Sequence, residues 1–252
     1  MSLQYNLLGN GASKVIVLHD WSQDITSNDP ILPYLDTKTF SFAMIDIRGY
    51  GQSIDQTGDY TVNEVVADVF DVIDKLGWSK FSLIGHSMTG MIAQKIAAEI
   101  PEKLNRLVLA TPVPASGMHA DDETLGFFNS MVDDDESFKA GMSGLTGARY
   151  TQEWGDYKLA KNRQTVNPQA MRGYCKMWAR GDFSNEMKIL SMPTLLICGK
   201  YDDDNLKLNA IEPKLKAWFS NLKRCELNCG HYPMQESPVE YACLVQEFLK
   251  EK

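Results

Sequence analysis

The sequence predicts an α/β fold, with a mostly parallel, doubly wound sheet and a helical lid inserted after a central strand. Short apolar runs typical of buried strands alternate with helical patterns over residues 1–112 and again over 191–252. The segment 113–190 has no strand pattern and carries short helical patterns rich in large apolar side chains. We therefore expect a core made of residues 1–112 and 191–252, with residues 113–190 forming the lid.

In the first block, four apolar runs bounded by turn residues indicate strands, at 14–18, 40–45, 80–84 and 107–110. A helix is expected to start at Asp29-Pro30, because Asp is a common cap and Pro fits the first turn. A second helix, 62–76, follows Thr61 and Glu64, whose spacing is typical of a capping box. A third, 91–100, ends before Pro101.

The second block predicts strands at 194–199 and 224–227, with a helix at 206–219 between them. A final helix begins around Ser237-Pro238 and reaches Leu249. In an open parallel sheet the loops at the carboxyl ends of the strands converge on one edge. Residues that follow different strands can therefore meet there.

Composition excludes several classes of function. The chain has 252 residues and a net charge of −8, and it has no cluster of Lys and Arg, so binding to nucleic acid or to an anionic membrane is not expected. No apolar stretch approaches the roughly 18 residues that span a bilayer, and the first residues do not resemble a secretory signal. Five scattered cysteines favour free thiols in a reducing compartment, so we expect a cytoplasmic protein.

No metal or organic cofactor is expected. Cys225 and Cys229 are not completed by a second Cys or His pair, as a tetrahedral metal site would require. The acidic run 133–136 lacks the spacing of a calcium loop. The expected partner is a small-molecule substrate, and the oligomeric state is not determined by the sequence.

The most informative motif is Gly85-His86-Ser87-Met88-Thr89-Gly90, between a strand pattern and a helix pattern. At such a tight corner the residues two before and two after the serine must be small, and the hydroxyl projects clear of the sheet. The amino terminus of the following helix favours developing negative charge. Ser87 is therefore the candidate nucleophile.

A serine hydroxyl needs a base, and the chain has only four histidines. His231 lies directly after the last strand pattern, so it can meet Ser87 at the same edge of the sheet. An orienting carboxylate is available from Asp202, Asp203 and Asp204, which follow the strand 194–199. The residues alone do not decide among these three.

An oxyanion hole needs hydrogen-bond donors aimed at the position where charge develops. The backbone N–H of Met88, just after the candidate nucleophile, is one expected donor. The second is expected from the loop after the strand 14–18, at the N–H of Trp21.

These motifs resemble the α/β-hydrolase superfamily, and the resemblance covers nearly the whole chain. The matching segments are His19-Asp20-Trp21, Asp46-x-Arg48-Gly49-x-Gly51-x-Ser53, Gly85 to Gly90, Gly199-Lys200-Tyr201-Asp202 and Gly230-His231-Tyr232-Pro233. The resemblance implies that Asp202 is the acid of a Ser-His-Asp triad and that the turn around Arg48 is structural.

Two positions depart from the family pattern. Asp20 stands where the family usually has Gly, and Thr89 stands where it has Gly or Ala. A carboxylate close to a developing oxyanion opposes catalysis unless it points away, and a β-branched residue beside the turn adds strain or narrows the pocket. We expect a substrate pocket formed by His19, Asp20, Phe127, Trp154 and Trp178.

The leading functional hypothesis is a serine hydrolase that cleaves carboxylic esters of small to medium, mostly apolar substrates through an acyl-enzyme. Relatives with the same motifs cleave carbon–carbon bonds, open lactones, form peracids or run cofactor-free dioxygenation, so these remain alternatives. Relatives with an Asp nucleophile are disfavoured because position 87 is Ser. A third hypothesis is a ligand-binding receptor or weakly active member, since fold constrains function loosely.

Overall fold

A computed structural model describes residues 2–251 and has a seven-stranded sheet with the strand order β1-β3-β2-β4-β5-β6-β7. The strands β2 to β7 run parallel, and only β1 is antiparallel, to β3. The fold class expected from the sequence is confirmed. The strands, in chain order, are Gln4–Leu8, Ser13–Leu18, Phe40–Asp46, Phe81–His86, Leu104–Ala110, Thr194–Gly199 and Leu222–Leu227.

The central strands were predictable because helices cover both faces of the sheet. Every residue of β3, β4 and β6 is buried, so these strands appear in the sequence as continuous apolar runs. The edge strand β1 was not predicted from the sequence. Its residues are exposed or half-buried, and its sequence, Gln4–Leu8, has no buried apolar run.

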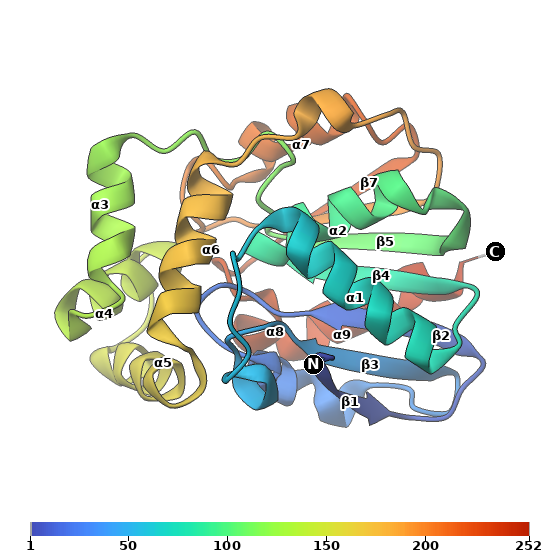
Figure 1. Ribbon diagram of the computed structural model, residues 1–252, viewed down its shortest axis with the longest axis horizontal. Coiled ribbons are helices and arrows are strands. Elements are labelled where there is room, and N and C mark those ends of the chain that lie inside the picture. Colours follow the sequence, from blue (N-terminus) through green and yellow to red (C-terminus); the bar gives the residue numbers. More distant parts are fainter. Residues whose placement is uncertain (1, 252) are drawn as a thin grey trace.

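Helices lie on both faces of the sheet (Figure 1). The helices α1 (Val62–Leu76) and α2 (Met88–Glu99) pack side by side on one face, and α9 (Pro238–Lys250) lies on the other. On that second face α9 contacts η1 (Ile25–Tyr34), a 3-10 helix. The remaining helices outside the insertion are α7 (Leu208–Lys216), the short α8 (Pro233–Glu236), and the 3-10 turns η2 (Gly51–Ser53) and η3 (Pro101–Lys103).

The helix expected to start at Asp29-Pro30 starts earlier. Its cap is Asp24, whose carboxylate accepts a hydrogen bond from the backbone N–H of Thr26, and Asp29 and Pro30 lie inside η1. The tighter i to i+3 pattern of a short 3-10 helix accommodates the prolines that would interrupt an α-helix.

Four α-helices and the 3-10 turn η4 (Ser184–Glu186) lie between β5 and β6. The α-helices are α3 (Asp122–Ser130), α4 (Asp135–Leu145), α5 (Gln152–Thr165) and α6 (Pro168–Arg180). Figure 1 shows them grouped beyond one end of the sheet, at the left of the view. This is the end at which the parallel strands terminate, so the insertion lies next to the loops that follow β2, β4, β6 and β7.

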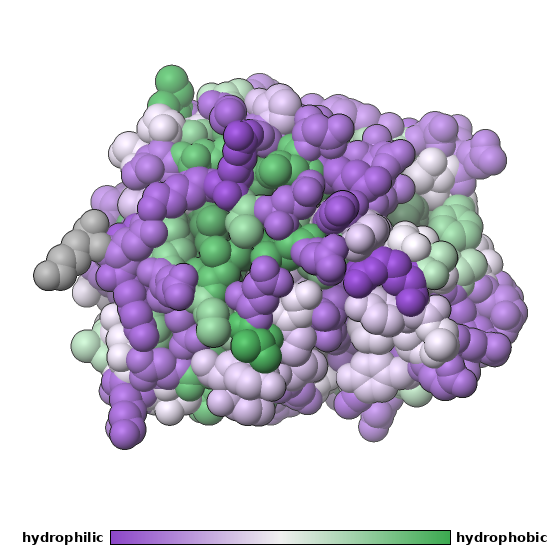
Figure 2. Space-filling model, turned by 180° about the vertical axis from the view of Figure 1, so that it is seen from behind, coloured by the Kyte–Doolittle hydropathy of each residue, from purple (hydrophilic) through white to green (hydrophobic). Residues whose placement is uncertain are grey.

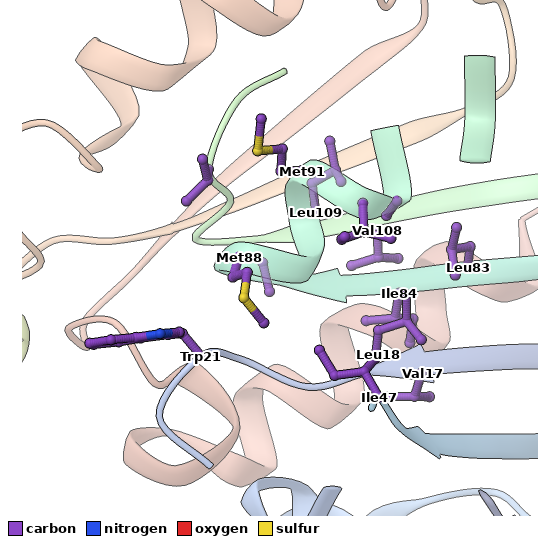
Figure 3. Close-up of a cluster of buried hydrophobic side chains, with 14 of the residues drawn as sticks. Val17, Leu18, Trp21, Ile47, Leu83, Ile84, Met88, Met91, Val108 and Leu109 are labelled. Atoms are coloured by element: carbon purple, nitrogen blue, oxygen red, sulfur yellow. The ribbon is translucent and has the colours of Figure 1, made fainter. Parts of the chain in front are cut away.

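The core beneath these loops is a layer of apolar side chains from neighbouring strands (Figure 3). Leu18 of β2, Ile84 of β4 and Leu109 of β5 are each at most 5% exposed. Burying a side chain of this size contributes about 1.5–3 kcal/mol, so the strand ends form a rigid platform for the loops above.

The surface is mostly polar. Figure 2 shows hydrophilic side chains over most of the face opposite to that of Figure 1, with hydrophobic side chains visible between them near the centre. Within residues 2–251, no helix combines the length and apolar character needed to cross a membrane.

Thr61 caps α1 as the sequence predicts, since its hydroxyl accepts a hydrogen bond from the N–H of Glu64 at 3.2 Å. We expect Thr61→Ala to lower the free energy of unfolding by about 1 kcal/mol in a urea titration, because an N–H at the helix start loses its partner. Thr151, at the start of α5, makes no such side-chain bond. Thr151→Ala is the matched control, and an equal loss there would contradict the capping interpretation.

Candidate active site

Ser87 occupies a sharp corner between β4 and α2, with φ 55° and ψ −119°. Positive φ is costly for a residue with a Cβ, by about 1–3 kcal/mol, so tight packing must hold this conformation. A Cβ on Gly85 would lie 2.5 Å from the carbonyl oxygen of Thr89, and one on Gly90 would lie 2.5 Å from Cβ of Pro112. Gly85 is therefore required for the close approach of β4 and α2, and Gly90 for the close approach of α2 and the loop after β5.

Thr89 fits at the corner through hydrogen bonds. Its hydroxyl donates to the carbonyl oxygen of His86 at 3.0 Å and accepts from the N–H of His86 at 3.1 Å. The side chain is fully buried and does not line the cavity described below. Thr89 therefore stabilises the turn, and its side chain does not narrow the pocket.

Ser87, His231 and Asp202 form a continuous chain of hydrogen bonds. Ser87 Oγ lies 2.7 Å from His231 Nε2, and His231 Nδ1 lies 2.8 Å from Asp202 Oδ2. The three residues follow β4, β7 and β6 respectively, and each is at most 8% exposed. Of the three candidate aspartates, Asp202 is the one that contacts His231, while the exposed Asp204 pairs with Lys207.

The charge state of His231 depends on two opposing effects. Burial by itself lowers the pKa of the imidazole, but the charge and the hydrogen bond of Asp202 outweigh it, so the pKa of His231 lies above its ordinary value of 6.5. The carboxylate thus stabilises the protonated ring and also orients its Nε2 toward Ser87.

The loop that carries His231 is held at several backbone atoms. The carbonyl oxygen of His231 accepts from His86 Nε2 at 2.8 Å and from the Thr111 hydroxyl at 3.0 Å. The Glu236 carboxylate accepts from the N–H groups of Gly230 and Tyr232. Sequence reasoning missed Thr111 and Glu236 as part of the site, because a residue that binds backbone atoms of a distant loop leaves no local motif.

The loop after β2 is shaped by Asp20. Asp20 Oδ1 accepts from the N–H and the hydroxyl of Ser22, at 2.5 and 2.6 Å, and Oδ2 faces His86 Nδ1 at 3.6 Å. The carboxylate is thus turned toward Ser22 and His86. Trp21, which lies between Asp20 and Ser22 in the chain, is held by two hydrogen bonds. Its indole N–H donates to the carbonyl oxygen of Met171, and its own carbonyl oxygen accepts from the Tyr50 hydroxyl.

Met88 follows β4 and Trp21 follows β2, and these two strands are neighbours in the sheet (Figure 3). Met88 is the first residue of α2, so its N–H has no partner within the helix. These are the two residues from which the sequence predicts oxyanion donors.

Ser87 and His231 open into a cavity of about 390 Å³. Three aromatic rings form one wall, those of Trp21, Phe128 and Trp178, with centroids 4.8–5.8 Å apart in edge-to-face contacts. Aliphatic and polar residues complete the lining: Asp20, Ser22, Val113, Met118, His119, Ala120, Asp121, Thr124, Leu145, Asp203, Asn205, Leu206 and Tyr232.

Of the five pocket residues expected from the sequence, Asp20 and Trp178 line this cavity and the other three lie outside it. His19 is buried below, where its Nε2 accepts from the N–H of Ile47 and its Nδ1 therefore donates to the carbonyl oxygen of Asp20. Phe127 is 42% exposed, because it lies one position, or 100° of helix rotation, from the inward-facing Phe128. Trp154 packs against Tyr232 and lines a separate hollow between α4 and α5.

Comparisons with known proteins identify the family of the chain. A family model described as alpha/beta hydrolase fold matches residues 9–238. The chain is 25% identical to the pimeloyl-[acyl-carrier protein] methyl ester esterase of Nitrosomonas europaea, over 95% of this chain and 96% of that protein. It is 23% identical to the enzyme of the same name from Legionella pneumophila, strain Corby, over 99% and 100%.

Solved structures share the fold. The bromoperoxidase from Bacillus anthracis superposes with a TM-score of 0.88 at 19% identity, covering 99% of this chain and 95% of that one. The enol-lactonase from Burkholderia xenovorans gives 0.84 at 22% identity, covering 99% and 96%. With a family model that spans nearly its whole length, the chain belongs to the alpha/beta hydrolase fold family.

Proposed function

We propose that this protein is a serine hydrolase that cleaves carboxylic esters of small to medium, mostly apolar substrates through an acyl-enzyme. The observation that carries the proposal is the hydrogen-bond chain Ser87–His231–Asp202 at the floor of a partly apolar cavity. The esterase names of relatives that match along their whole length support the same class of reaction.

In the proposed reaction Ser87 Oγ attacks the ester carbonyl as its proton passes to His231 Nε2, and Asp202 stabilises the imidazolium that results. The tetrahedral intermediate collapses, the carbon–oxygen bond to the alcohol breaks, and His231 returns the proton to the leaving oxygen. Water then repeats the sequence on the acyl-enzyme, with His231 again as base, and releases the acid and free Ser87.

The N–H groups of Met88 and Trp21 stabilise the oxyanion in this proposal. A donor of this kind contributes on the order of a hundredfold or more to kcat. Asp20 is compatible with this role because both of its carboxylate oxygens are directed elsewhere, toward Ser22 and His86. The segment 113–190 acts as the lid, since it contributes Met118, Phe128 and Trp178 to the cavity.

The charges around the cavity favour a neutral ester. Asp20, Asp121 and Asp203 line it, and among residues 2–251 its lining contains no lysine or arginine. Several basic residues on the outside of the insertion are paired with acids, as Arg163 is with Asp135 and Arg172 with Asp133. The acidic lining of the cavity favours a free, neutral small ester over one that carries a negative charge near the cavity.

We expect methyl valerate to be hydrolysed with a kcat/KM about tenfold or more above that of monomethyl glutarate, because the distal carboxylate of the second ester approaches like charges. Hydrolysis of both esters is followed by acid release in a pH-stat. Asp203→Asn should bring the kcat/KM values of the two esters closer together, because it removes one of these charges. A preference for the anionic ester would contradict the proposed substrate class.

A fluorophosphonate tests the nucleophile directly. Ser87 Oγ should displace fluoride from phosphorus and form a stable phosphonate ester, which tandem mass spectrometry locates on one peptide. We expect the label on Ser87, and none after the protein is unfolded in urea, because the reaction needs His231 in place. Absence of the label from the folded protein, or a label on another residue, would reject the proposed mechanism.

A further inference from the structure

Lys158, on α5 of the insertion, is fully buried and is not used by the mechanism above. Its Nζ donates to the side-chain oxygens of Gln23 at 2.9 Å and Gln235 at 3.3 Å, and it lies 3.8 Å from the centroid of the Tyr232 ring. Gln23 belongs to the loop after β2 and Gln235 to α8, just after His231. One ammonium group of the insertion therefore contacts both loops that complete the candidate site.

All of these contacts are with neutral groups. Among the described residues, no carboxylate lies within 4.0 Å of Lys158 Nζ. A buried cation is costly unless an opposite charge compensates it, so the compensating charge must be sought further away.

Asp20 is the carboxylate in a position to compensate Lys158. Among the charged groups that lower the pKa of Asp20, Lys158 has the largest effect. Burial lowers the pKa of Lys158, and among the charged groups that raise this pKa Asp20 has the largest effect. A bridge of side chains joins them, because Asp20 Oδ1 accepts from the Ser22 hydroxyl at 2.6 Å, and that hydroxyl lies 3.2 Å from the Tyr232 hydroxyl. Lys158 Nζ lies over the face of the Tyr232 ring in a cation–π contact.

The other titratable groups near the pair already have partners. Asp24 accepts from the N–H and hydroxyl of Thr26, and Glu236 accepts from two backbone N–H groups and pairs with Arg149. His86 and His19 also face Asp20, and both bind backbone atoms. By contrast, Asp20 Oδ2 is buried and has no hydrogen-bond donor.

We infer that Lys158 and Asp20 act as one buried charge pair, bridged by Ser22 and Tyr232, that positions the loop of Trp21 and the loop of His231 for the proposed hydrolysis. Both are positioning residues, since they act through other groups. The kinetic part of this inference rests on the proposed function, whereas the pairing itself does not.

A double-mutant cycle with Lys158→Met, Asp20→Asn and the double variant tests the pairing through the midpoint of urea unfolding. Lys158→Met leaves the Asp20 charge uncompensated, so we expect a clear fall in the midpoint. The double variant should recover at least half of that fall, because both charges are gone. Lys158→Met combined with Asp24→Asn is the matched control. If the double variant is no more stable than Lys158→Met, or if Asp24→Asn rescues equally well, the pairing is wrong.

The same variants test the positioning role through kinetics with p-nitrophenyl butyrate. We expect Lys158→Met to lower kcat about tenfold or more with a smaller change in KM, and Asp20→Asn to restore part of kcat. Burial lowers the pKa of Lys158 to about 8, so kcat of the wild type should also fall above about pH 8 as the ammonium loses its proton. This alkaline fall should be absent from the double variant.

The outcomes separate the two proposals. If the double variant recovers stability but the wild type shows no ester turnover, the charge pair is supported and the proposed esterase function is rejected. Normal turnover with strictly additive effects on stability and kcat would support the esterase and reject the pair.

Discussion

Ser87→Ala is expected to lower kcat for p-nitrophenyl butyrate by about ten-thousandfold or more, with little change in KM. The variant loses the only atom that forms the acyl-enzyme, while the cavity that binds the ester keeps its shape. Initial rates of p-nitrophenol release over a range of ester concentrations measure both constants. Residual turnover above the uncatalysed rate would reflect the oxyanion donors and the binding of the ester in the cavity.

Ser82→Ala is the matched control, because Ser82 is also a buried serine but lies near the start of β4, at the end of the strand opposite to Ser87. We expect it to keep the activity of the wild type. If Ser87→Ala turned the ester over as fast as Ser82→Ala, Ser87 would not be the nucleophile and the proposed reaction would fail.

Asp202→Asn is expected to lower kcat by about ten-thousandfold, because the amide cannot stabilise the imidazolium that forms during attack. It should also change the pH dependence. The base must be neutral, so kcat/KM of the wild type is full above the pKa of His231 and falls as the pH drops through it. Since Asp202 raises that pKa above 6.5, the fall begins above this value in the wild type and moves to lower pH in the variant.

A profile of kcat/KM from about pH 5 to about pH 9 measures both effects. Asp204→Asn is the control, since Asp204 is exposed and pairs only with Lys207. An acid limb that stayed at the same pH in Asp202→Asn would mean that His231 is not the titrating base, or that Asp202 does not act on it.

Residues whose position follows from local chain geometry were predictable from the sequence. The corner at Ser87 needs a strand, small neighbours and a helix start, and all of these leave a signal within about ten residues. His231 follows a strand end in the same way, although the sheet that joins the two loops is built from segments far apart in the chain. Their convergence follows from the parallel topology, which the buried strands themselves predict.

Other features were missed or left open because they depend on partners that are distant in sequence. Residues alone did not choose among three adjacent aspartates, since that choice depends on which carboxylate reaches His231 across β6 and β7. Of the aromatic residues expected in the pocket, Trp178 lines the cavity whereas Phe127 and Trp154 lie outside it, because the rotation of each insertion helix about its axis is set by packing. The edge strand β1 was not predicted because it pairs with a neighbour on one side only, and its exposed and half-buried residues do not form a buried apolar run.

Lys158 is the clearest example of a residue whose environment the tertiary structure decides. In the sequence it is one lysine in a polar helix, and such a residue normally extends into solvent. In the folded chain it is buried between two loops that lie more than a hundred residues from it on one side and more than seventy on the other. Motifs and periodicity thus determine the sheet, the corner at Ser87 and the position of His231, because those depend on neighbours along the chain. The choice of Asp202, the shape of the cavity and the balance of buried charge depend on neighbours in space, so they are settled only when the chain has folded.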